Sequence, residues 1–370
     1  MSIVIQASDL DHARIDGTRV YLRELLKRFG PLSPETEFLL YHKQYFNPAL
    51  APPRYTNYTE RAIPFPYAWM QTRFALEMFR QRPEKLFLPI QAAPFFLPQG
   101  IDCVATIHDL AFKKFPETFP QHHLWKLNFM LDTAVRQANR LIAVSESTKR
   151  DLLEFFSELS PEKITVIHHG FDAEFFGQRL PAAEVSAVLN TWGLSRQQYA
   201  LYVGALQPRK NLVRLIQAFE EAKQGNAEMK LVLAGEPAWL ADSILRAREE
   251  SRYRADIILT GRTDFAALRA LYQGARLFAF PSLYEGFGLP LLEAFASGVP
   301  VLTADNSSLR EVAGSGALYV DARDVGAMSS QLSDLWRNES LQNRLVMNGD
   351  QELRRFSWEK TAAETLRIIQ

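Results

Sequence analysis

Two glutamates flanking a glycine-rich turn make residues 281–300 the strongest candidate for a chemical site. The segment reads PSLYEGFGLPLLEAFASGVP, with Glu285 in the turn and Glu293 eight residues later. The preceding apolar run predicts a strand, and the following residues predict a helix. Gly286 and Gly288 let the backbone approach a ligand, and a helix start offers N–H groups to an anion. The two carboxylates, about two turns apart, could accept hydrogen bonds from sugar and ribose hydroxyls.

A second candidate site is the basic turn GALQPRKN at residues 204–211. Arg209 and Lys210 stand between a predicted strand and a predicted helix, with Asn211 as the expected N-cap. Two cations at a helix start oppose the helix dipole, and an anionic ligand would remove that conflict. A diphosphate fits because Arg can fork two phosphate oxygens and Lys adds a mobile charge. The alternative is a solvated basic turn.

The elements that must position these residues alternate along the chain as short apolar strands and amphipathic helices. This rhythm predicts an α/β fold of two Rossmann-like domains with parallel sheets facing a central cleft, where ligands bind at the carboxyl ends of the strands. The predicted parts are residues 1–176, an interdomain connection at 177–198, a second domain at 199–354 and a crossing helix at 355–370. The predicted strands are 2–7, 37–42, 85–89, 102–107, 140–144, 164–168, 199–205, 229–235, 256–261, 275–280, 299–304 and 317–321. The predicted helices are 18–29, 70–81, 121–138, 146–156, 210–222, 239–250, 264–273 and 288–297.

Composition excludes several classes of protein. The 42 basic and 42 acidic residues give a net charge of zero, which argues against nucleic-acid binding. The single cysteine, Cys103, allows no internal disulfide and no cysteine-rich metal site, and its apolar neighbours predict a buried thiol. We expect neither a signal peptide nor a transmembrane helix, which favours a cytoplasmic protein. No strand is followed by G-x-G-x-x-G, which disfavours an NAD dehydrogenase.

Together, GALQPRKN and PSLYEGFGLPLLEAFASGVPV resemble the retaining glycosyltransferases of family four, which have the GT-B fold. The segments TIHDLAF, RLIAVSESTKRDL, ITVIHHGFD and FSWEKTA are similar to that family's recurring segments, in its usual order. The resemblance covers nearly the full chain. It implies transfer of a sugar from a nucleotide-diphosphate sugar to an acceptor, with retained anomeric configuration and no metal or other cofactor. The first domain would then bind the acceptor and the second the donor.

The resemblance also implies roles for individual residues. Arg209 and Lys210 match the pair that holds the donor diphosphate, Glu285 the acid that faces the donor sugar, and Glu293 the acid that binds the ribose. His108 matches a histidine near the donor sugar and acceptor, so the catalytic set is His108, Arg209, Lys210 and Glu285. The remaining donor-binding residues are expected to be Gly17, Gly204, Gly261, Arg262, Gly286, Phe287, Gly288 and Leu289.

Three features of the first domain leave alternatives open. The family's glycine-rich turn after the first strand is replaced by ARIDGTRVYLREL, where Arg19 stands at the second glycine position. Arg19 could narrow the acceptor side or add a phosphate contact. His168 and His169 end a strand and could act as a structural hinge, or one of them could line the cleft. Ser145 is expected first as a helix N-cap, with a donor-side role as the alternative.

Aromatic and basic residues gather at 63–89 and 111–126. The first stretch carries the aromatic side chains Phe65, Tyr67, Trp69, Phe74 and Phe79. These stretches could seat on the anionic inner face of a membrane and meet a lipid-linked acceptor. The alternative is ordinary helix packing with a solvated face.

The leading hypothesis is a glycosyltransferase that moves a hexose to a glycan or lipid-linked acceptor in polysaccharide or glycolipid assembly. HDLAF with PETF resembles branches that often use GDP-mannose, so we expect that donor. The alternatives are a non-catalytic nucleotide-sugar-binding subunit, or an epimerase or phosphorylase of the same architecture. The order of the segments argues against an epimerase or phosphorylase, and the presence of Glu285, Lys210 and His108 argues against a non-catalytic subunit.

Overall fold

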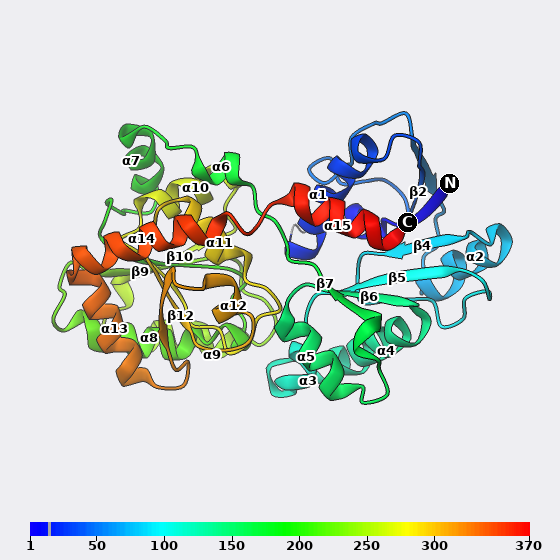
Figure 1. Cartoon of the computed structure of the whole chain (residues 1–370). Coiled ribbons are helices and arrows are strands. Elements are labelled where there is room, and N and C mark those ends of the chain that lie inside the picture. Colours follow the sequence, from blue (N-terminus) through cyan, green and yellow to red (C-terminus); the bar gives the residue numbers. More distant parts are fainter. Residues whose placement is uncertain (14–15) are drawn as a thin grey trace. The chain divides into compact units, whose positions relative to one another are not determined.

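The computed structural model describes residues 1–13 and 16–370, which form two compact units (Figure 1). The first unit comprises Met1–Lys113, Gln121–Gly170 and Phe356–Gln370. The second comprises Lys114–Pro120 and Phe171–Arg355. The short segment of the second unit is held within it by Trp239, whose indole N–H donates to the carbonyl of Thr118 at 2.9 Å.

The first unit is built on a seven-stranded parallel sheet with the order β3-β2-β1-β4-β5-β6-β7. Its central strands are apolar and buried on both faces, as parallel strands covered by helices must be. The strands are β1 (Ser2–Gln6), β2 (Glu37–His42), β3 (Tyr58–Ala62), β4 (Lys85–Leu88), β5 (Asp102–Ile107), β6 (Arg140–Ala143) and β7 (Ile164–Val166). The helices are α1 (Gly17–Leu32), α2 (Ala75–Gln81), α3 (Ala111–Lys114), α4 (Gln121–Gln137), α5 (Glu146–Phe155) and α15 (Trp358–Ile369).

The last helix of the chain, α15, packs on α1 within this unit (Figure 1). Ser357 caps it by accepting a hydrogen bond from the N–H of Lys360. The Arg28 guanidinium on α1 binds Glu359, with Nε 2.8 Å from a carboxylate oxygen. The side chain of Trp358 is buried, so the final helix contributes to the core of the first unit.

The second unit contains a six-stranded parallel sheet with the order β10-β9-β8-β11-β12-β13. The strands are β8 (Tyr199–Val203), β9 (Lys230–Ala234), β10 (Ile257–Gly261), β11 (Leu277–Phe280), β12 (Val301–Ala304) and β13 (Ala317–Val320). The helices are α6 (Ala173–Gly177), α7 (Ala182–Asn190), α8 (Leu212–Lys223), α9 (Asp242–Glu250), α10 (Phe265–Gly274), α11 (Leu289–Ala296), α12 (Leu309–Ala313), α13 (Val325–Arg337) and α14 (Glu339–Leu353). The two sheets confirm the predicted α/β class.

Besides short helices that were not predicted, such as α3, α6 and α12, three segments differ in detail from the sequence-based expectation. Strand β3 was not predicted because its sequence, YTERA, is polar and largely exposed at the sheet edge. The helix expected at 70–81 begins with a π-helical turn at Met70–Phe74. Residues 177–198 belong to the second unit, where α7 packs on α10.

The aromatic stretch at 63–89 divides into core and surface residues. Trp69 and Phe74 are buried and stack with ring centroids 5.0 Å apart, so these two do not form part of a membrane-facing surface. The Trp69 indole N–H donates to the carbonyl of Ile63 at 2.8 Å, which satisfies its polar atom inside the core. Tyr67 is 78% exposed, and Phe65 and Phe79 are also exposed.

Cys103 lies on β5 and is fully buried. Burial raises the pKa of its thiol to about 12. Across residues 1–13 and 16–370, no helix combines the length and apolar character needed to cross a bilayer.

Candidate active site

Arg209, Lys210 and Glu285 form a buried ion cluster in the second unit. The Glu285 carboxylate accepts from the Arg209 guanidinium through one oxygen, at 2.9 Å. Its other oxygen accepts from the Lys210 ammonium at 2.5 Å. Each of the three residues is at most 9% exposed. The cluster joins the turn after β8 to the turn after β11, which are neighbouring strands of the sheet.

The electrostatic environment keeps Glu285 ionised. Burial on its own raises the pKa of this carboxyl, but the charges of Lys210 and Arg209 outweigh burial and hold the pKa at about 2. The cluster therefore carries a net charge of about +1 at neutral pH. Buried charges of this kind persist only when they are paired.

The loop that carries Glu285 is held by two serines from the β12–α12 connection. The hydroxyl of Ser308 lies 2.9 Å from the carbonyl oxygen of Glu285 and 2.8 Å from that of Phe287, and donates to both. The hydroxyl of Ser307 accepts from the N–H of Glu285 at 3.0 Å. Sequence reasoning missed both serines because nothing in their local sequence indicates contact with residues about 20 positions earlier.

Gly288 gives the loop the backbone conformation that starts α11. Its φ is +111°, a region that side chains other than glycine's rarely adopt. Leu289 follows as the first helical residue, so the first N–H groups of α11 lie directly after Gly286 and Phe287. The predicted loop residues therefore gather at the N-terminal end of one helix, beside the ion cluster.

Glu293 lies on α11 and accepts a hydrogen bond from the Tyr272 hydroxyl at 2.8 Å. Burial raises the pKa of Glu293 to about 7, although the Tyr272 hydrogen bond acts in the opposite direction. Glu293 and Glu285 thus have pKa values on opposite sides of the usual range, because only Glu285 has cationic partners. Tyr272, on α10, was not predicted as a partner.

The predicted residues Gly204 and Gly261 lie at the carboxyl ends of β8 and β10, and Gly235 lies between them at the end of β9. A Cβ at Gly235 would lie 2.0 Å from the carbonyl oxygen of Gly204, so only glycine allows this close approach. Gly235 also forms a β-bridge with Gly261, whose φ is +64°. The next residue, Arg262, is exposed. Asn211 occupies the N-cap position of α8, but its amide instead donates to the carbonyls of Pro281 and Ala322.

His108 belongs to the first unit, at the carboxyl end of β5. Its Nε2 lies 2.8 Å from the carbonyl oxygen of Pro89, which can only accept, so we assign the proton to Nε2. Burial lowers the pKa of His108, more than that carbonyl and nearby carboxylates raise it. The neutral ring then presents Nδ1 as a hydrogen-bond acceptor.

The ring of His108 packs in an aromatic cluster with Tyr21, His169 and Trp358. The Tyr21 ring centroid lies 5.1 Å from that of His108 and 4.7 Å from that of His169. His169 is buried and contacts Trp358 at 5.8 Å between ring centroids. These contacts support the structural reading of His169.

Gly17 is the first residue of α1, and Asp16 caps that helix by accepting from the N–H of Arg19. The Arg19 guanidinium folds back onto the Asp16 carboxylate and donates through Nε to the carbonyl of Asp9 at 3.2 Å. Its side chain is only 13% exposed. Arg19 is thus held by carboxylates of its own unit. Arg14 and Ile15 of this turn lie outside the described residues.

Ser145 is the N-cap of α5, as predicted, and its hydroxyl accepts a hydrogen bond from the N–H of Thr148 at 3.0 Å.

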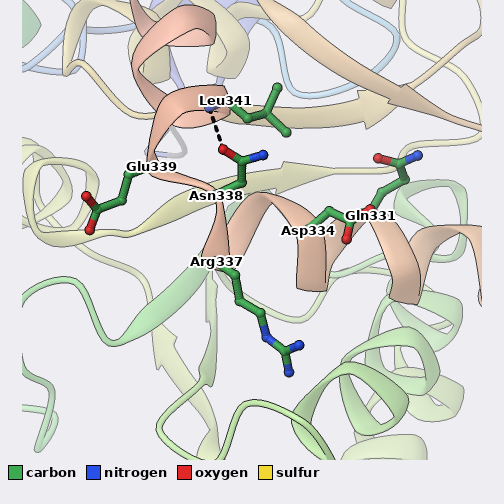
Figure 2. Close-up of a pocket in the computed structure, with 6 residues that line it drawn as sticks. All are labelled: Gln331, Asp334, Arg337, Asn338, Glu339 and Leu341. Carbon is green, nitrogen blue, oxygen red and sulfur yellow. Dashed lines mark hydrogen bonds between the residues drawn. The ribbon is translucent and has the colours of Figure 1, made fainter.

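A separate hollow lies at the junction of α13 and α14 (Figure 2). It is lined by Gln331, Asp334, Arg337, Asn338, Glu339 and Leu341. Asn338 accepts a hydrogen bond from the N–H of Leu341 and caps α14 there (Figure 2). None of the predicted site residues belongs to this hollow.

The part of the chain that the structure describes contains no group of three or more His, Cys, Asp or Glu side chains arranged to hold a metal ion.

Two family models match the chain, one in each half. Residues 16–175 match Glycosyltransferase Family 4, and residues 191–352 match Glycosyl transferases group 1. Together with the two parallel sheets, these matches define a hexosyltransferase of the GT-B class.

Curated relatives place the chain within that class. O-antigen chain mannosyltransferase B from Escherichia coli is 31% identical over 274 residues, covering 74% of this chain and 71% of the relative. The serotype-specific mannosyltransferase WbdA from Escherichia coli is 28% identical over 61% of this chain, which spans only 28% of that longer protein. The chain belongs to the family-four glycosyltransferases, in their mannosyltransferase-like branch.

Solved structures share the fold at low sequence identity. Sucrose-phosphate synthase from Thermosynechococcus elongatus has a TM-score of 0.74 and 18% identity, covering 100% of this chain and 98% of that one. Anabaena HepE, solved in complex with UDP-glucose, has a TM-score of 0.75 and 16% identity, with 99% of each chain covered. These likenesses show the GT-B fold.

Proposed function

We propose that this glycosyltransferase moves a mannosyl residue from GDP-mannose to a hydroxyl of a glycan or lipid-linked acceptor, with retention of anomeric configuration and without a metal ion. The observation that carries the proposal is the buried cluster of Arg209, Lys210 and Glu285 beside the start of α11. The mannosyltransferase names of the relatives from Escherichia coli support the choice of sugar. The further role is in polysaccharide or glycolipid assembly, on the cytoplasmic side of the membrane.

The geometry supports a division of labour for the donor. When the bond to the anomeric carbon breaks, negative charge grows on the departing diphosphate. Arg209, Lys210 and the first N–H groups of α11 are fixed in place to stabilise that charge, which lowers the barrier. In this proposal the two cations stabilise the charge on the diphosphate, for which other transferases use a bound metal.

The acceptor side of the proposal rests on His108 and on phosphate-assisted attack. The acceptor hydroxyl attacks the anomeric carbon on the face that the diphosphate leaves, and its proton passes to the departing phosphate oxygen. No carboxylate of the enzyme acts as a covalent nucleophile. Neutral His108 accepts a hydrogen bond at Nδ1 from a hydroxyl of the sugar donor or of the acceptor substrate, and orients that hydroxyl.

Product analysis over a donor panel tests the proposal. The enzyme is incubated with GDP-mannose, UDP-glucose and other nucleotide sugars, with mannosides as acceptors and with EDTA present. We expect transfer from GDP-mannose, and proton NMR of the product should show an α-linked sugar from the α-linked donor. Transfer that needs added metal, or a product of inverted configuration, contradicts the corresponding part of the proposal.

We also propose contact between the first unit and an anionic membrane surface. Phe96 is 67% exposed and Trp125 is 74% exposed, and the Trp125 ring lies almost parallel to that of Phe129, with centroids 5.7 Å apart. Exposed aromatic rings beside basic residues such as Lys126 are typical of interfacial anchors. We expect Trp125→Ser to weaken binding to anionic vesicles. Tyr45→Ser, which changes an 85% exposed residue outside this group, is the control. Binding that ignores anionic lipid and salt contradicts the proposal.

A further inference from the structure

We infer that Glu285 is an exchangeable internal counterion: it pairs with Arg209 and Lys210 while the donor site is empty, and the diphosphate of an arriving donor displaces it. This inference rests on the proposed function, since it assigns those two cations to the diphosphate. It adds a role for Glu285 before binding and after transfer, as the anion that holds the cations and competes with the leaving diphosphate.

The contacts show one carboxylate serving two cations at once. One Glu285 oxygen lies 2.9 Å from the Arg209 guanidinium and the other 2.5 Å from the Lys210 ammonium. The Arg209 guanidinium also donates to the carbonyl of Tyr284 at 2.5 Å, and the Lys210 ammonium lies 5.3 Å from the centre of the Phe280 ring. The carboxylate therefore holds both cationic heads in place.

Burial explains why a counterion is needed. The three side chains are 9–11% exposed, and removing one partner from such a cluster leaves charge without compensation in a poorly solvated place. Glu285 supplies that compensation within the chain. The pKa of about 2 keeps its charge constant over the working pH range, so the exchange requires no proton.

A diphosphate and the Glu285 carboxylate compete for the same N–H donors, and they repel each other at short range. Displacing the carboxylate is unfavourable unless it finds new hydrogen-bond donors. A nucleotide sugar brings hydroxyl groups that can donate to the displaced carboxylate. A nucleoside diphosphate lacks the hydroxyls of the transferred sugar, and its ribose hydroxyls are assigned to Glu293, so the free carboxylate of Glu285 helps to expel the diphosphate product once the sugar has been transferred.

Calorimetric titration with inorganic pyrophosphate and with GDP tests the inference on the full chain. Glu285→Gln removes the competing charge and retains the shape of the side chain. We expect it to bind both anions about tenfold more tightly than the wild type, since a charge repulsion is removed. Sugar transfer should fall at least a hundredfold in the same variant. Loss of folding alone would weaken both anion binding and sugar transfer. Tighter anion binding together with slower transfer therefore separates the proposed role from a structural one.

Glu249→Gln is the matched control, because it removes the acid of an exposed ion pair with Arg248 elsewhere in the second unit. We expect its anion affinities to equal those of the wild type. If Glu285→Gln is too unstable to titrate, melting with and without pyrophosphate replaces calorimetry. The anion should then raise the melting temperature of the variant more than that of the wild type.

The outcomes are distinguishable. Wild-type binding of GDP with equal or weaker anion binding by Glu285→Gln overturns the counterion inference and leaves the proposed function intact. If neither protein binds pyrophosphate, GDP or GDP-mannose, both the inference and the proposed donor site are wrong. Tighter anion binding together with lost transfer supports the inference.

Discussion

Glu293 is a carboxylic acid whose surroundings favour its neutral form. Its pKa of about 7 lies above the ordinary value because burial disfavours the charge. The family resemblance assigns this group to the ribose hydroxyls, which donate more strongly to its ionised form. We therefore expect GDP affinity to rise between pH 5.5 and 7.5 and then level off. Calorimetry across this range, in buffers of different ionisation enthalpy, should also detect proton release on binding below pH 7.

Glu293→Gln supplies the control, because the titration of the diphosphate itself is common to both proteins. The variant should bind GDP more weakly at pH 8 and lose that part of the pH dependence which belongs to Glu293. Although the variant should bind GDP more weakly than the wild type at pH 8, it should be more stable. Glu293 ionises near pH 4.5 in the unfolded chain but only near pH 7 in the fold, so the free energy of unfolding falls between these pH values and the variant should melt higher than the wild type at pH 8. Identical pH profiles for the two proteins would contradict the assignment.

The role of His108 can be tested by substituting asparagine or glutamine, whose side-chain amides each imitate one ring nitrogen. Asparagine places a carbonyl oxygen near the position of Nδ1, whereas glutamine reaches the position of Nε2 and can still donate to the Pro89 carbonyl. If Nδ1 is the functional acceptor, His108→Asn should retain more kcat/KM than His108→Gln. We expect a loss of at least a hundredfold for His108→Gln. Greater activity in His108→Gln would show that the Nε2 contact is the one that matters.

At the residue scale, the two motifs were assigned to one donor site only through the family resemblance, and the structure joins Arg209, Lys210 and Glu285 in one ion cluster. Partners from distant elements were not predictable, because hydrogen bonds such as the one between Tyr272 and Glu293 depend on how α10 and α11 pack. Aromatic residues were equally ambiguous. Trp69 and Tyr67 have similar local sequence, yet one is core and the other surface.

The connection between β12 and α12 supports the loop that carries Glu285. Ser308→Ala removes the hydroxyl that bonds the carbonyls of Glu285 and Phe287. We expect a loss of about 1–2 kcal/mol in the free energy of unfolding and about tenfold in kcat/KM for the donor, since the loop is less well fixed. Urea denaturation and steady-state kinetics measure the two effects.

Ser297→Ala is the matched control for that prediction. Ser297 is as deeply buried in the same unit, but its hydroxyl has no hydrogen-bond partner among the described residues. Its removal should leave both stability and turnover nearly unchanged. Equal effects of the two substitutions would mean that the Ser308 hydroxyl does not support the loop.

At the scale of elements, strands that alternate with helices were predictable wherever the strand is a run of buried apolar residues. Strand β3 lacked that signal because its residues face solvent at an edge. Helix α7 was placed in a connection because 177–198 has no strand pattern. Its place in the second unit depends on contacts such as the Leu180 N–H with the Gln273 amide oxygen, which local sequence does not encode.

At the scale of the whole molecule, the chain leaves the first unit after Gly170 and returns to it at Phe356. A Cβ on Gly170 would lie 2.1 Å from the backbone nitrogen of Trp358, so Gly170→Ala must push α15 from its place. We expect a loss of about 1–3 kcal/mol in the free energy of unfolding. Gly177→Ala, where a Cβ meets no atom within 4 Å, should be neutral. Equal stabilities in urea denaturation would contradict this reading.

The deeply buried thiol of Cys103 has a practical consequence for labelling. At neutral pH a thiol with a pKa of about 12 is almost entirely protonated, and maleimides react with the thiolate. Since Cys103 is the single cysteine of the chain, surface cysteines can be introduced without first replacing it. One such cysteine on each unit would carry a pair of fluorescent dyes on an otherwise native chain, and energy transfer between them would measure the distance between the two labelled positions.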